Sequence, residues 1–209
     1  MSRRWRARRS RRIARASRGR LDLRRTFRRS MSRGGVPVEL LFRRPRPGKS
    51  DLVALIDVSF SAATAAEFLL SLLGSSHRFF RHVLQLAYVD DLTEISFVHG
   101  HVVPHGPLDL NARSDFGNVL RRFRERYEHS LGRNTVLLVL GDARNNRRPP
   151  RADLLARLRR QVRAAVWLNP ELKQRWNTGD SVIARYKKHV DVVLAAANLR
   201  ELAAALDAI

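Results

Sequence analysis

Three oxygen-bearing side chains stand at alternate positions in the middle of the chain. Asp57, Ser59 and Ser61 follow the apolar run of residues 52–56, which has the length and composition of a buried β-strand. Alternate side chains in the loop after such a strand can point to one spot above the sheet edge. Carboxylate and hydroxyl oxygens suit a small hard cation, and Mg²⁺ takes few protein oxygens and keeps several waters. By itself the motif is more simply a strand-end turn in which Ser59 or Ser61 caps the next helix, and a metal site needs further ligands from elsewhere in the chain.

Two further polar positions follow the same logic. Ser114 precedes a helical pattern over residues 116–127, where its alternative role is to cap the helix. Asp142 closely follows residues 135–140, a continuous apolar run typical of a second buried strand. In parallel sheets, ligand sites lie beyond the carboxyl ends of the strands. We therefore predict one metal site, formed by Asp57, Ser59, Ser61, Ser114 and Asp142.

Strand-like and helical segments alternate along the chain after residue 50. Expected strands lie at residues 51–57, 83–89, 93–98, 135–140, 165–168 and 190–194, and expected helices at residues 62–73, 116–127, 153–161, 181–188 and 198–208. This alternation predicts an α/β fold, in which a mostly parallel central sheet carries helices on both faces, as in a Rossmann-like domain. Asp180 and Ser181 are expected to cap the helix over residues 181–188.

The positive charge of the chain is concentrated near its N-terminus. The 209 residues carry a formal net charge of +22. Residues 1–50 contribute 19 basic and 2 acidic side chains, a net of +17, whereas residues 51–209 contribute 22 and 17, a net of +5. We expect residues 1–35 to form an Arg-rich arm, largely disordered or with a short helix, before a domain over residues 36–209. Nucleic acid, an acidic protein surface, anionic lipid or solvent alone would satisfy such an arm.

Several kinds of chemistry lack the residues they need. The chain has no cysteine, which excludes disulfides, thiolate zinc sites and cysteine nucleophiles. Gly48-Lys49-Ser50 lacks the first glycine of a phosphate-binding loop, and no dinucleotide-binding or serine-hydrolase motif is present. His99, His101 and His105 lie in an expected strand end and Pro/Gly loop and match no strong metal motif. The longest apolar stretch, residues 62–73, is too short to span a bilayer.

The order of these motifs resembles the von Willebrand factor A (VWA) domain, and specifically the CoxE-like family of bacterial proteins. Beyond the metal motif, the segments similar to that family are residues 21–30, 140–146, 166–171 and 176–181. In the A-domain pattern, the three elements of a metal-ion-dependent adhesion site (MIDAS) correspond to Asp57 with Ser59 and Ser61, to Ser114 in place of the usual threonine, and to Asp142. Phe60 replaces the glycine usual between the two serines.

The resemblance implies a binding protein without catalytic activity. A MIDAS holds Mg²⁺, or Mn²⁺ in its place, and the metal takes an acidic residue of another protein. CoxE-like proteins are typically associated with a MoxR-type AAA+ ATPase and are implicated in the maturation of metalloenzymes, which implies an adaptor in the cytoplasm or at the periphery of a membrane. The competing hypothesis is a nucleic-acid-binding protein that uses the Arg-rich arm. Candidate partner contacts are Phe60, Asp115, Arg144, Asn145 and Trp167.

Overall fold

The computed structural model describes residues 20–21, 42–43, 49–73, 80–98 and 101–198. The chain divides into two units, residues 1–48 and residues 49–209. In the first unit, the described residues form an antiparallel pair of short strands, β1 (Arg20–Leu21) and β2 (Phe42–Arg43). The expected N-terminal arm lies outside the described residues, apart from β1. So does the expected final helix over residues 198–208, apart from its first residue.

The second unit contains a seven-stranded sheet and four α-helices. The strands are β3 (Asp51–Asp57), β4 (Val83–Tyr88), β5 (Leu92–Val98), β6 (His101–Pro104), β7 (Thr135–Leu140), β8 (Ala164–Asn169) and β9 (Val192–Ala195). The helices are α3 (Ala63–Leu73), α4 (Phe116–Tyr127), α5 (Ala152–Gln161) and α6 (Ile183–Lys187), with the short 3₁₀ helices η2 (Glu128–Ser130) and η3 (Lys173–Arg175).

The strands lie in the order β6-β5-β4-β3-β7-β8-β9. The four pairs from β4 to β9 are parallel, whereas β5 and β6 are attached in antiparallel fashion at one edge. This confirms the predicted α/β fold with a mostly parallel sheet. The antiparallel strand β6 was not predicted, because His101–Pro104 was expected to be loop. It pairs with β5 from Ile95 to Val98.

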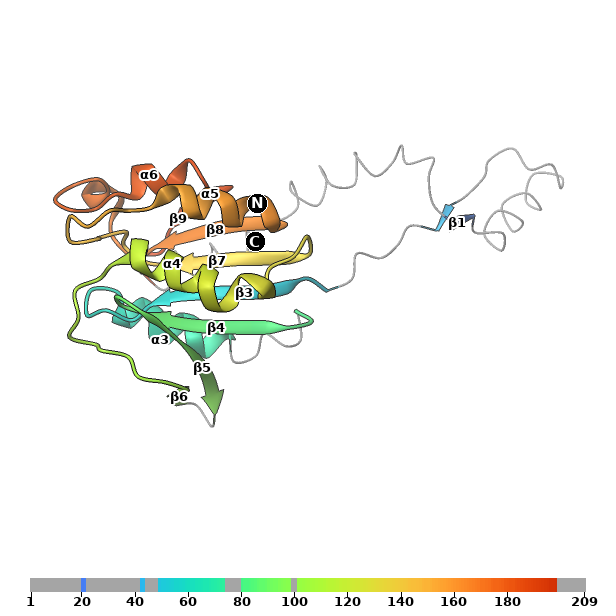
Figure 1. Cartoon of the computed structure of the whole chain (residues 1–209), viewed down its shortest axis with the longest axis horizontal. Coiled ribbons are helices and arrows are strands. Elements are labelled where there is room, and N and C mark those ends of the chain that lie inside the picture. Colours follow the sequence, from blue (N-terminus) through green and yellow to red (C-terminus); the bar gives the residue numbers. More distant parts are fainter. Residues whose placement is uncertain (1–19, 22–41, 44–48, 74–79, 99–100, 199–209) are drawn as a thin grey trace. The chain divides into compact units, whose positions relative to one another are not determined.

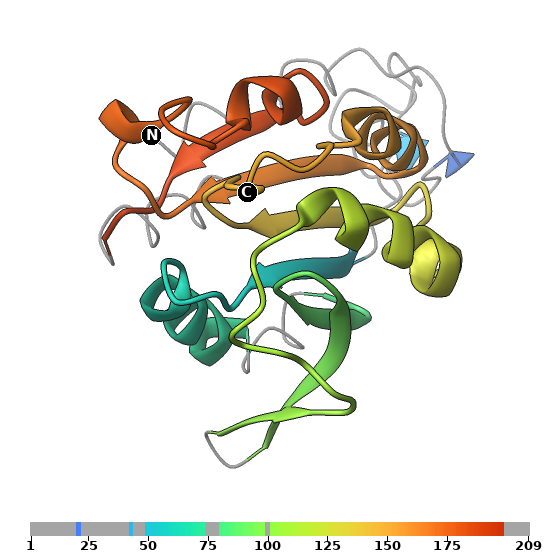
Figure 2. The same cartoon turned by 60° about the vertical axis from the view of Figure 1, so that its left-hand side comes forward.

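Helices cover both faces of the sheet (Figure 1). On one face, α3 packs against a core that includes Leu69, Leu70 and Ile56. On the other face, α4, α5 and α6 pack against a second core. Figure 2, in which the carboxyl ends of the parallel strands come forward, shows the same separation of α3 from α4 and α5. Because both faces are covered, the central strands are continuously apolar, and each fully buried large side chain contributes about 1.5–3 kcal/mol.

Strand β3 is the point at which the chain changes direction across the sheet. The connection from β3 through α3 leads to β4 on one side, and the connection through α4 leads to β7 on the other. Leu55 therefore lies between Leu86 of β4 and Val139 of β7. Ligands of open α/β sheets bind at such a switch point, beyond the carboxyl ends of the strands. The fold thus marks the space above β3 and β7 as the place for a site.

Helix α4 begins at Asp115, and its sequence explains both its start and its orientation. The Oδ1 atom of Asp115 accepts a hydrogen bond of 2.9 Å from the backbone N–H of Asn118, which is a standard N-cap. Phe116, Leu120 and Phe123 recur at helical spacing and are buried. The predicted alternative, a cap formed by Ser114, is therefore wrong, and the Ser114 hydroxyl is not used to begin the helix.

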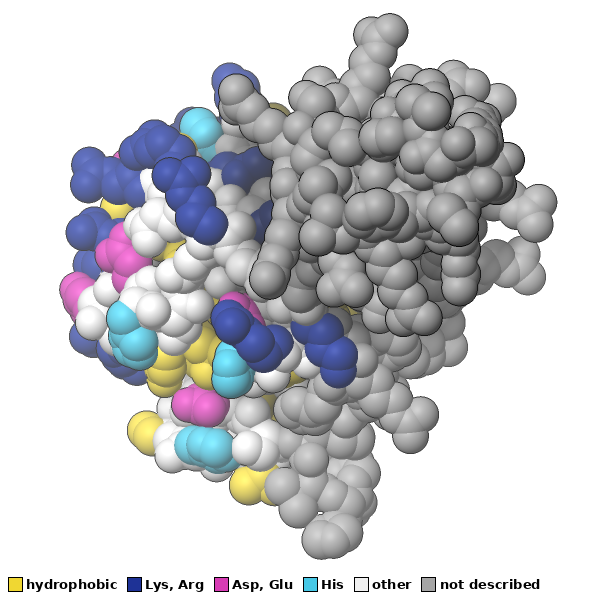
Figure 3. Space-filling view, turned by 90° about the vertical axis from the view of Figure 1, so that its right-hand side faces the viewer, with side chains coloured by type: hydrophobic (Ala, Val, Ile, Leu, Met, Phe, Trp, Pro, Cys, Tyr) yellow, Lys and Arg dark blue, Asp and Glu magenta, His cyan; other side chains and the backbone are white. Residues whose placement is uncertain are grey.

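Figure 3 views the molecule from the amino ends of the parallel strands, the edge opposite to Asp57 and Asp142. Lys and Arg side chains are spread over the described part of this face, among Asp, Glu and His. Asp51 begins β3 at this edge and forms an ion pair of 2.6 Å with Arg81. The two ends of β3 thus carry two aspartates in different settings, one paired and partly exposed and one buried.

Candidate metal centre

Asp57 and Asp142 lie at the carboxyl ends of two neighbouring parallel strands. The register pairs Ile56 with Leu140, so the last residue of β3 stands beside Gly141 and one residue short of Asp142. Both carboxylates are buried, with exposed fractions of 2% for Asp57 and 1% for Asp142. The two positions predicted from separate strand ends therefore meet at the switch point.

A continuous series of hydrogen bonds joins four of the five predicted residues. The backbone N–H of Ser59 donates to Oδ1 of Asp57 at 2.9 Å, which folds the loop over its first residue. The hydroxyls of Ser59 and Ser61 lie 3.3 Å apart. The hydroxyl of Ser61 donates to Oδ2 of Asp142 at 2.7 Å. Two carboxylates and two hydroxyls are thus gathered at one place, at the ends of two parallel strands.

Ser114 is held at the same edge through its backbone. The N–H of the next residue, Asp115, donates to the carbonyl of Val89 at 3.1 Å, which fixes the loop beside the end of β4. From the other side, Nδ2 of Asn146 donates to the Ser114 carbonyl at 2.9 Å. Hydrogen bonds therefore hold the backbone around Ser114 between the end of β4 and the loop after β7. That its hydroxyl is a ligand stays a prediction.

A close backbone approach at Gly141 brings the two strand ends together. A Cβ atom on this glycine would lie 2.4 Å from the Tyr88 hydroxyl and 3.4 Å from the Cβ and Oδ2 atoms of Asp57. Tyr88 is buried, and its hydroxyl donates to the carbonyl of Leu140 at 3.2 Å, so it has little freedom to move. Glycine at this position is what allows Asp57 to sit against β7.

The electrostatic setting of Asp57 favours a cation. Burial, followed by the nearby Asp142 carboxylate, raises the pKa of Asp57 from 3.8 to about 7, although hydrogen bonds from Ser59 oppose the shift. Among the described residues, no Lys, Arg or His forms an ion pair with either carboxylate. Two buried carboxylates without a basic partner are costly, and a bound cation would offset that cost.

The donor set fits a hard divalent cation better than a transition metal. Its members are carboxylate and hydroxyl oxygens, the ligands that Mg²⁺ takes, and the described part of the site holds no imidazole or thiolate. In the described residues, no group of three or more His, Cys, Asp or Glu is placed to hold a metal ion. A metal site at Asp57 and Asp142 therefore depends on the serine hydroxyls.

Comparison with known proteins identifies the domain. The family model of CoxE-like proteins containing a VWA domain matches residues 1–204. The chain belongs to this family. Its VWA domain is similar to proximal thread matrix protein 1 from the mussel byssus, with 14% identity, a TM-score of 0.55, and coverage of 77% of this chain and 46% of that chain. The likeness at this identity shows the fold alone.

Two further solved structures resemble the VWA domain. The mussel protein with a zinc-occupied MIDAS motif gives a TM-score of 0.50 at 14% identity, with coverage of 77% and 46%. A von Willebrand factor type A protein from Catenulispora acidiphila gives 0.49 at 13% identity, with coverage of 77% of this chain and 41% of that chain. The chain thus spans less than half the length of these proteins. No curated protein matches it.

Aromatic side chains pack beneath the edge of the VWA domain that carries Asp57 and Asp142. Phe116 lies at the centre, with its ring 5.2 Å from Tyr88, 5.0 Å from Trp167 and 5.2 Å from Tyr186. The polar ends of three of these residues reach the chain around Asp142. Tyr88 donates to Leu140, the Trp167 indole N–H to the carbonyl of Gly141 at 2.7 Å, and Tyr186 to the carbonyl of Pro150 at 2.9 Å. Side chains of the hydrophobic core therefore fix the backbone directly before Asp142.

The loop after Asp142 has an unusual backbone. Five non-glycine residues of the described chain have a positive φ, and four of them fall between residues 143 and 151: Ala143, Asn146, Arg147 and Arg151. Such conformations cost roughly 1–2 kcal/mol each and persist only where the surroundings impose them. Strain of this kind is common at functional sites, and here it lies in the loop that follows the predicted ligand Asp142.

An ion-pair network holds the part of this loop around Arg144 and Asn146. The backbone N–H of Arg144 donates to Oδ1 of Asp142 at 2.9 Å, and its guanidinium pairs with Glu171 at 2.6 Å and Asp180 at 2.8 Å. Asp180 also accepts the N–H of Asn146 at 3.0 Å. Burial opposes the effect, but the bonds from Arg144 and Asn146 lower the pKa of Asp180. The network connects the loop after Asp142 to the loops before and after η3.

The expected partner residues fall into two groups. Phe60 is 99% exposed and Asp115 is partly exposed, although Asp115 caps α4 and pairs with Arg148 at 3.2 Å. Arg144 is mostly engaged with Glu171 and Asp180. Asn145 and Trp167 are buried, with exposed fractions of 1% and 0%. The prediction that a partner contacts these two residues directly is therefore wrong in this structure, because their side chains lack accessible surface.

Two further details differ from the sequence-based expectations or refine them. Asp180 and Ser181 do not cap α6, which begins after Val182 without a side-chain cap; the Ser181 hydroxyl instead donates to the Asp142 carbonyl at 3.2 Å. The His105 ring lies 2.7 Å from the Ser96 hydroxyl, which agrees with a hydrogen-bonded role. Of the described helices, none is long and apolar enough to cross a membrane.

Sequence reasoning missed the residues that position the ligands. Gly141, Tyr88 and Arg144 hold Asp57 and Asp142 in place through contacts between distant parts of the chain. The glycine directly before Asp142 was the one available signal, because a glycine between a strand and a ligand suggests a close backbone approach.

Proposed function

We propose that the VWA domain binds Mg²⁺, or Mn²⁺ in its place, and uses the metal to hold an acidic residue of another protein. The ligands in this proposal are Asp57, Ser59, Ser61, Ser114 and Asp142. The observation that carries it is the series of hydrogen bonds from Asp57 through Ser59 and Ser61 to Asp142, at the switch point of the sheet. The zinc-occupied MIDAS motif of the mussel protein supports the assignment by analogy of fold.

The donor set favours recognition over catalysis. Neutral hydroxyls leave much of the charge of a divalent cation uncompensated, so the cation attracts a carboxylate from outside. Hydrolysis would need a general base within hydrogen-bond reach of a bound water. Apart from the two proposed ligand carboxylates, no described acidic or histidine side chain forms a hydrogen bond to the serines of the site. We therefore infer a binding module without catalytic activity.

The family suggests the process in which the binding module takes part. CoxE-like proteins are associated with MoxR-type AAA+ ATPases, and we propose that this chain links such an ATPase to a client protein during metalloenzyme maturation or complex remodelling. Because the ATPase consumes ATP, the role belongs in the cytoplasm or at the cytoplasmic side of a membrane. The partner's contribution is an acidic residue at the metal, with Phe60 as an adjoining contact.

Calorimetric titration with Mg²⁺ and Mn²⁺ tests the metal site. Asp57→Asn removes a ligand and should weaken binding at least tenfold. Asp51→Asn is the matched control, since it changes an aspartate at the opposite end of the same strand, roughly 20 Å away. Its ion pair with Arg81 is largely exposed, so its loss should cost little stability. Equal affinity in both variants would reject Asp57 as a ligand.

A second experiment tests the adaptor role. A purified MoxR-type ATPase should be retained by the immobilised wild-type chain in Mg²⁺ and released by a chelator. Asp57→Asn should not retain it in either buffer, and Asp51→Asn should behave like wild type. If the ATPase is retained equally with and without the chelator, and equally by wild type and Asp57→Asn, no metal bridge exists.

The net charge of +17 over residues 1–50 favours nucleic-acid binding as the second candidate function. Phosphate contacts release counterions, so such binding falls steeply as salt rises. A salt titration with a DNA duplex of random sequence, repeated with Asp57→Asn, separates the two functions. Binding that is strong, steep in salt and independent of Asp57 favours nucleic acid.

A further inference from the structure

A cavity adjoins the proposed metal site on the side of α3. Its volume is about 260 Å³, and its lining includes Ser61, Thr64, Ala65, Pro170 and Ala196. Ser61 is also the residue whose hydroxyl donates to Asp142. Because one side chain belongs to both places, the cavity and the metal site are contiguous. A molecule whose carboxylate reaches the metal therefore has its neighbouring atoms at the mouth of this cavity.

Four of the seven residues that line the cavity are apolar, and none is charged. Thr64 and Ala65 belong to the first turn of α3, and Pro170 and Ala196 follow the ends of β8 and β9. The N–H of Ala196 donates to the carbonyl of Asn169 at 2.8 Å, which ties the two strand ends together. The remaining lining residues are Ala197 and Asn198, so the cavity combines four apolar side chains with three uncharged polar ones and offers little to recognise a charge.

The size of the cavity limits its occupant. Pockets for cofactors and drug-sized ligands usually measure 300–1,000 Å³, so this one suits a single side chain rather than a cofactor. Phe60 adds a second apolar surface on the same loop, since it is 99% exposed and stands between the two serines of the metal motif. An apolar surface next to a metal that binds carboxylates suits a ligand that has both a carboxylate and an apolar group.

We propose that the partner segment carries an aliphatic side chain next to its metal-binding carboxylate, and that this side chain enters the cavity between α3 and the ends of β8 and β9. The proposal rests on the proposed metal-dependent function and specifies the partner. The carboxylate supplies affinity through the metal, and the aliphatic group supplies selectivity through burial. An acidic residue flanked only by polar residues is bound more weakly.

Small carboxylates test this directly, because they carry both groups in one molecule. Acetate and 3-methylbutanoate are titrated into the full-length, Mg²⁺-loaded chain and followed by NMR chemical shifts. The branched acid should bind about tenfold more tightly, because each buried CH₂ contributes about 0.8 kcal/mol and part of the group remains exposed. Equal affinities for the two acids would overturn the proposal and would mean that the cavity is only a packing defect of this chain.

Two variants on α3 localise the effect. Thr64→Trp places a large ring at an exposed position of the cavity lining and should reduce the affinity for 3-methylbutanoate to that for acetate. Glu67→Trp changes an exposed residue of the same helix outside the lining and should keep the tenfold difference. Unchanged acetate binding in both variants shows that they are folded. A difference that survives Thr64→Trp would place the aliphatic group elsewhere and contradict the proposal.

The two proposals fail in different ways. If the chain binds no Mg²⁺, or if neither carboxylate shifts the resonances of the Mg²⁺-loaded chain, the proposed function fails. If acetate binds in the presence of Mg²⁺ and the methyl branches add nothing, the metal-dependent function stands and only the aliphatic subsite is rejected.

Discussion

The hydroxyl of Ser61 donates a hydrogen bond of 2.7 Å to the carboxylate of Asp142, a residue 81 positions further along the chain. This bond joins the loop after β3 to the loop after β7 across two adjacent strands. The proposed metal centre is therefore complete only when the sheet is assembled with its native register. Its formation is coupled to the tertiary structure of the domain, which makes the stability of the domain and metal binding mutually dependent.

The metal-free domain should lose stability as the pH rises through the acidic range. Burial and the Asp142 carboxylate raise the pKa of Asp57 to about 7, above its ordinary value of 3.8. The folded chain therefore keeps a proton that the unfolded chain releases, and the free energy of unfolding falls between about pH 4 and pH 7, by about 4 kcal/mol. Denaturant unfolding in a chelator, compared with Asp57→Asn, measures this contribution.

In the metal-free state, Asp57→Asn should remove this part of the pH dependence and be the more stable protein at pH 7. Addition of Mg²⁺ should stabilise the wild type and leave the variant unchanged. An identical pH profile for both proteins would show that Asp57 is ionised throughout.

Gly141→Ala should destabilise the domain by about 1–3 kcal/mol, the usual cost of overpacking a core. The added Cβ would lie 2.4 Å from the Tyr88 hydroxyl. Tyr88→Phe removes that hydroxyl, so the double variant should be more stable than the sum of the two single changes predicts. Thermal unfolding of the four proteins measures this coupling. Strict additivity would mean that the backbone, not Tyr88, absorbs the clash.

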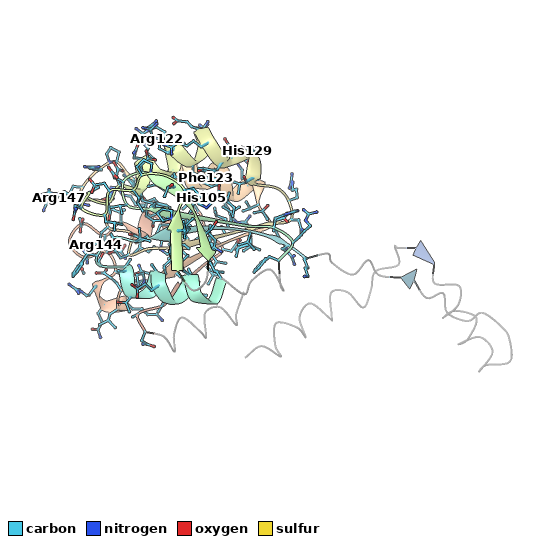
Figure 4. The ribbon with its side chains drawn as sticks, turned by 90° about the horizontal axis from the view of Figure 1, so that it is seen from below. His105, Arg122, Phe123, His129, Arg144 and Arg147 are labelled. Carbon is cyan, nitrogen blue, oxygen red and sulfur yellow. The ribbon has the colours of Figure 1, made fainter. Side chains whose placement is uncertain are left out.

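Arg144→Gln should lower the free energy of unfolding, and it should weaken Mg²⁺ binding as a consequence. The guanidinium holds Glu171 at 2.6 Å and Asp180 at 2.8 Å, and its loss leaves the mostly buried Glu171 without its main partner. We expect a loss of about 1–3 kcal/mol, together with weaker Mg²⁺ affinity, because the loop that carries Asp142 loosens. Figure 4 shows Arg144 and Arg147 near the same edge of the domain, with Arg147 at the rim.

Arg147→Gln is the matched control for Arg144→Gln, since Arg147 is exposed and forms no ion pair with any described residue. It should leave the unfolding free energy within about 0.5 kcal/mol of the wild type. A loss in Arg147→Gln as large as that in Arg144→Gln would contradict a specific role for the network.

Phe60→Ala should separate partner binding from folding. The side chain is 99% exposed, so its removal should change the unfolding free energy by less than about 0.5 kcal/mol and should not alter Mg²⁺ affinity. Retention of the ATPase or client should fall, because an exposed aromatic side chain beside the metal contributes apolar contact. Leu110→Ala, at a residue 61% exposed in another loop, is the control. Equal retention by both variants would remove Phe60 from the interface.

The sequence predicted the central strands well because their signal is local. The strands expected over residues 51–57 and 135–140 coincide with β3 and β7 to the residue, since strands buried on both faces need no polar alternation. The meeting of Asp57 and Asp142 followed from the parallel arrangement alone. These features depend on composition and on one topological rule, both of which can be read from one sequence.

Strand pairing and side-chain packing account for what the sequence did not predict. Strand β6 ends at Pro104 in a segment with loop composition, and it forms because β5 offers a free edge for pairing. Ser181 was expected to cap a helix, but the approach of Asp142 gives its hydroxyl another acceptor. Trp167 looked like a candidate partner contact, yet the helices α4 and α6 bury it. For Ser181 and Trp167, partners distant in sequence outweighed the local preference, whereas β6 pairs with the strand directly before it.

The indole of Trp167 has a consequence for how this domain is studied. Its ring stacks on Tyr186 at 5.0 Å, and its N–H bonds to the carbonyl of Gly141, directly before Asp142. A tryptophan so enclosed emits at short wavelength, and its emission responds to the polarisation of the group that accepts its N–H. Once the other two tryptophans, Trp5 and Trp176, are replaced by phenylalanine, Trp167 is an intrinsic optical probe one residue away from a proposed metal ligand, and occupancy of the site should be measurable without any attached label.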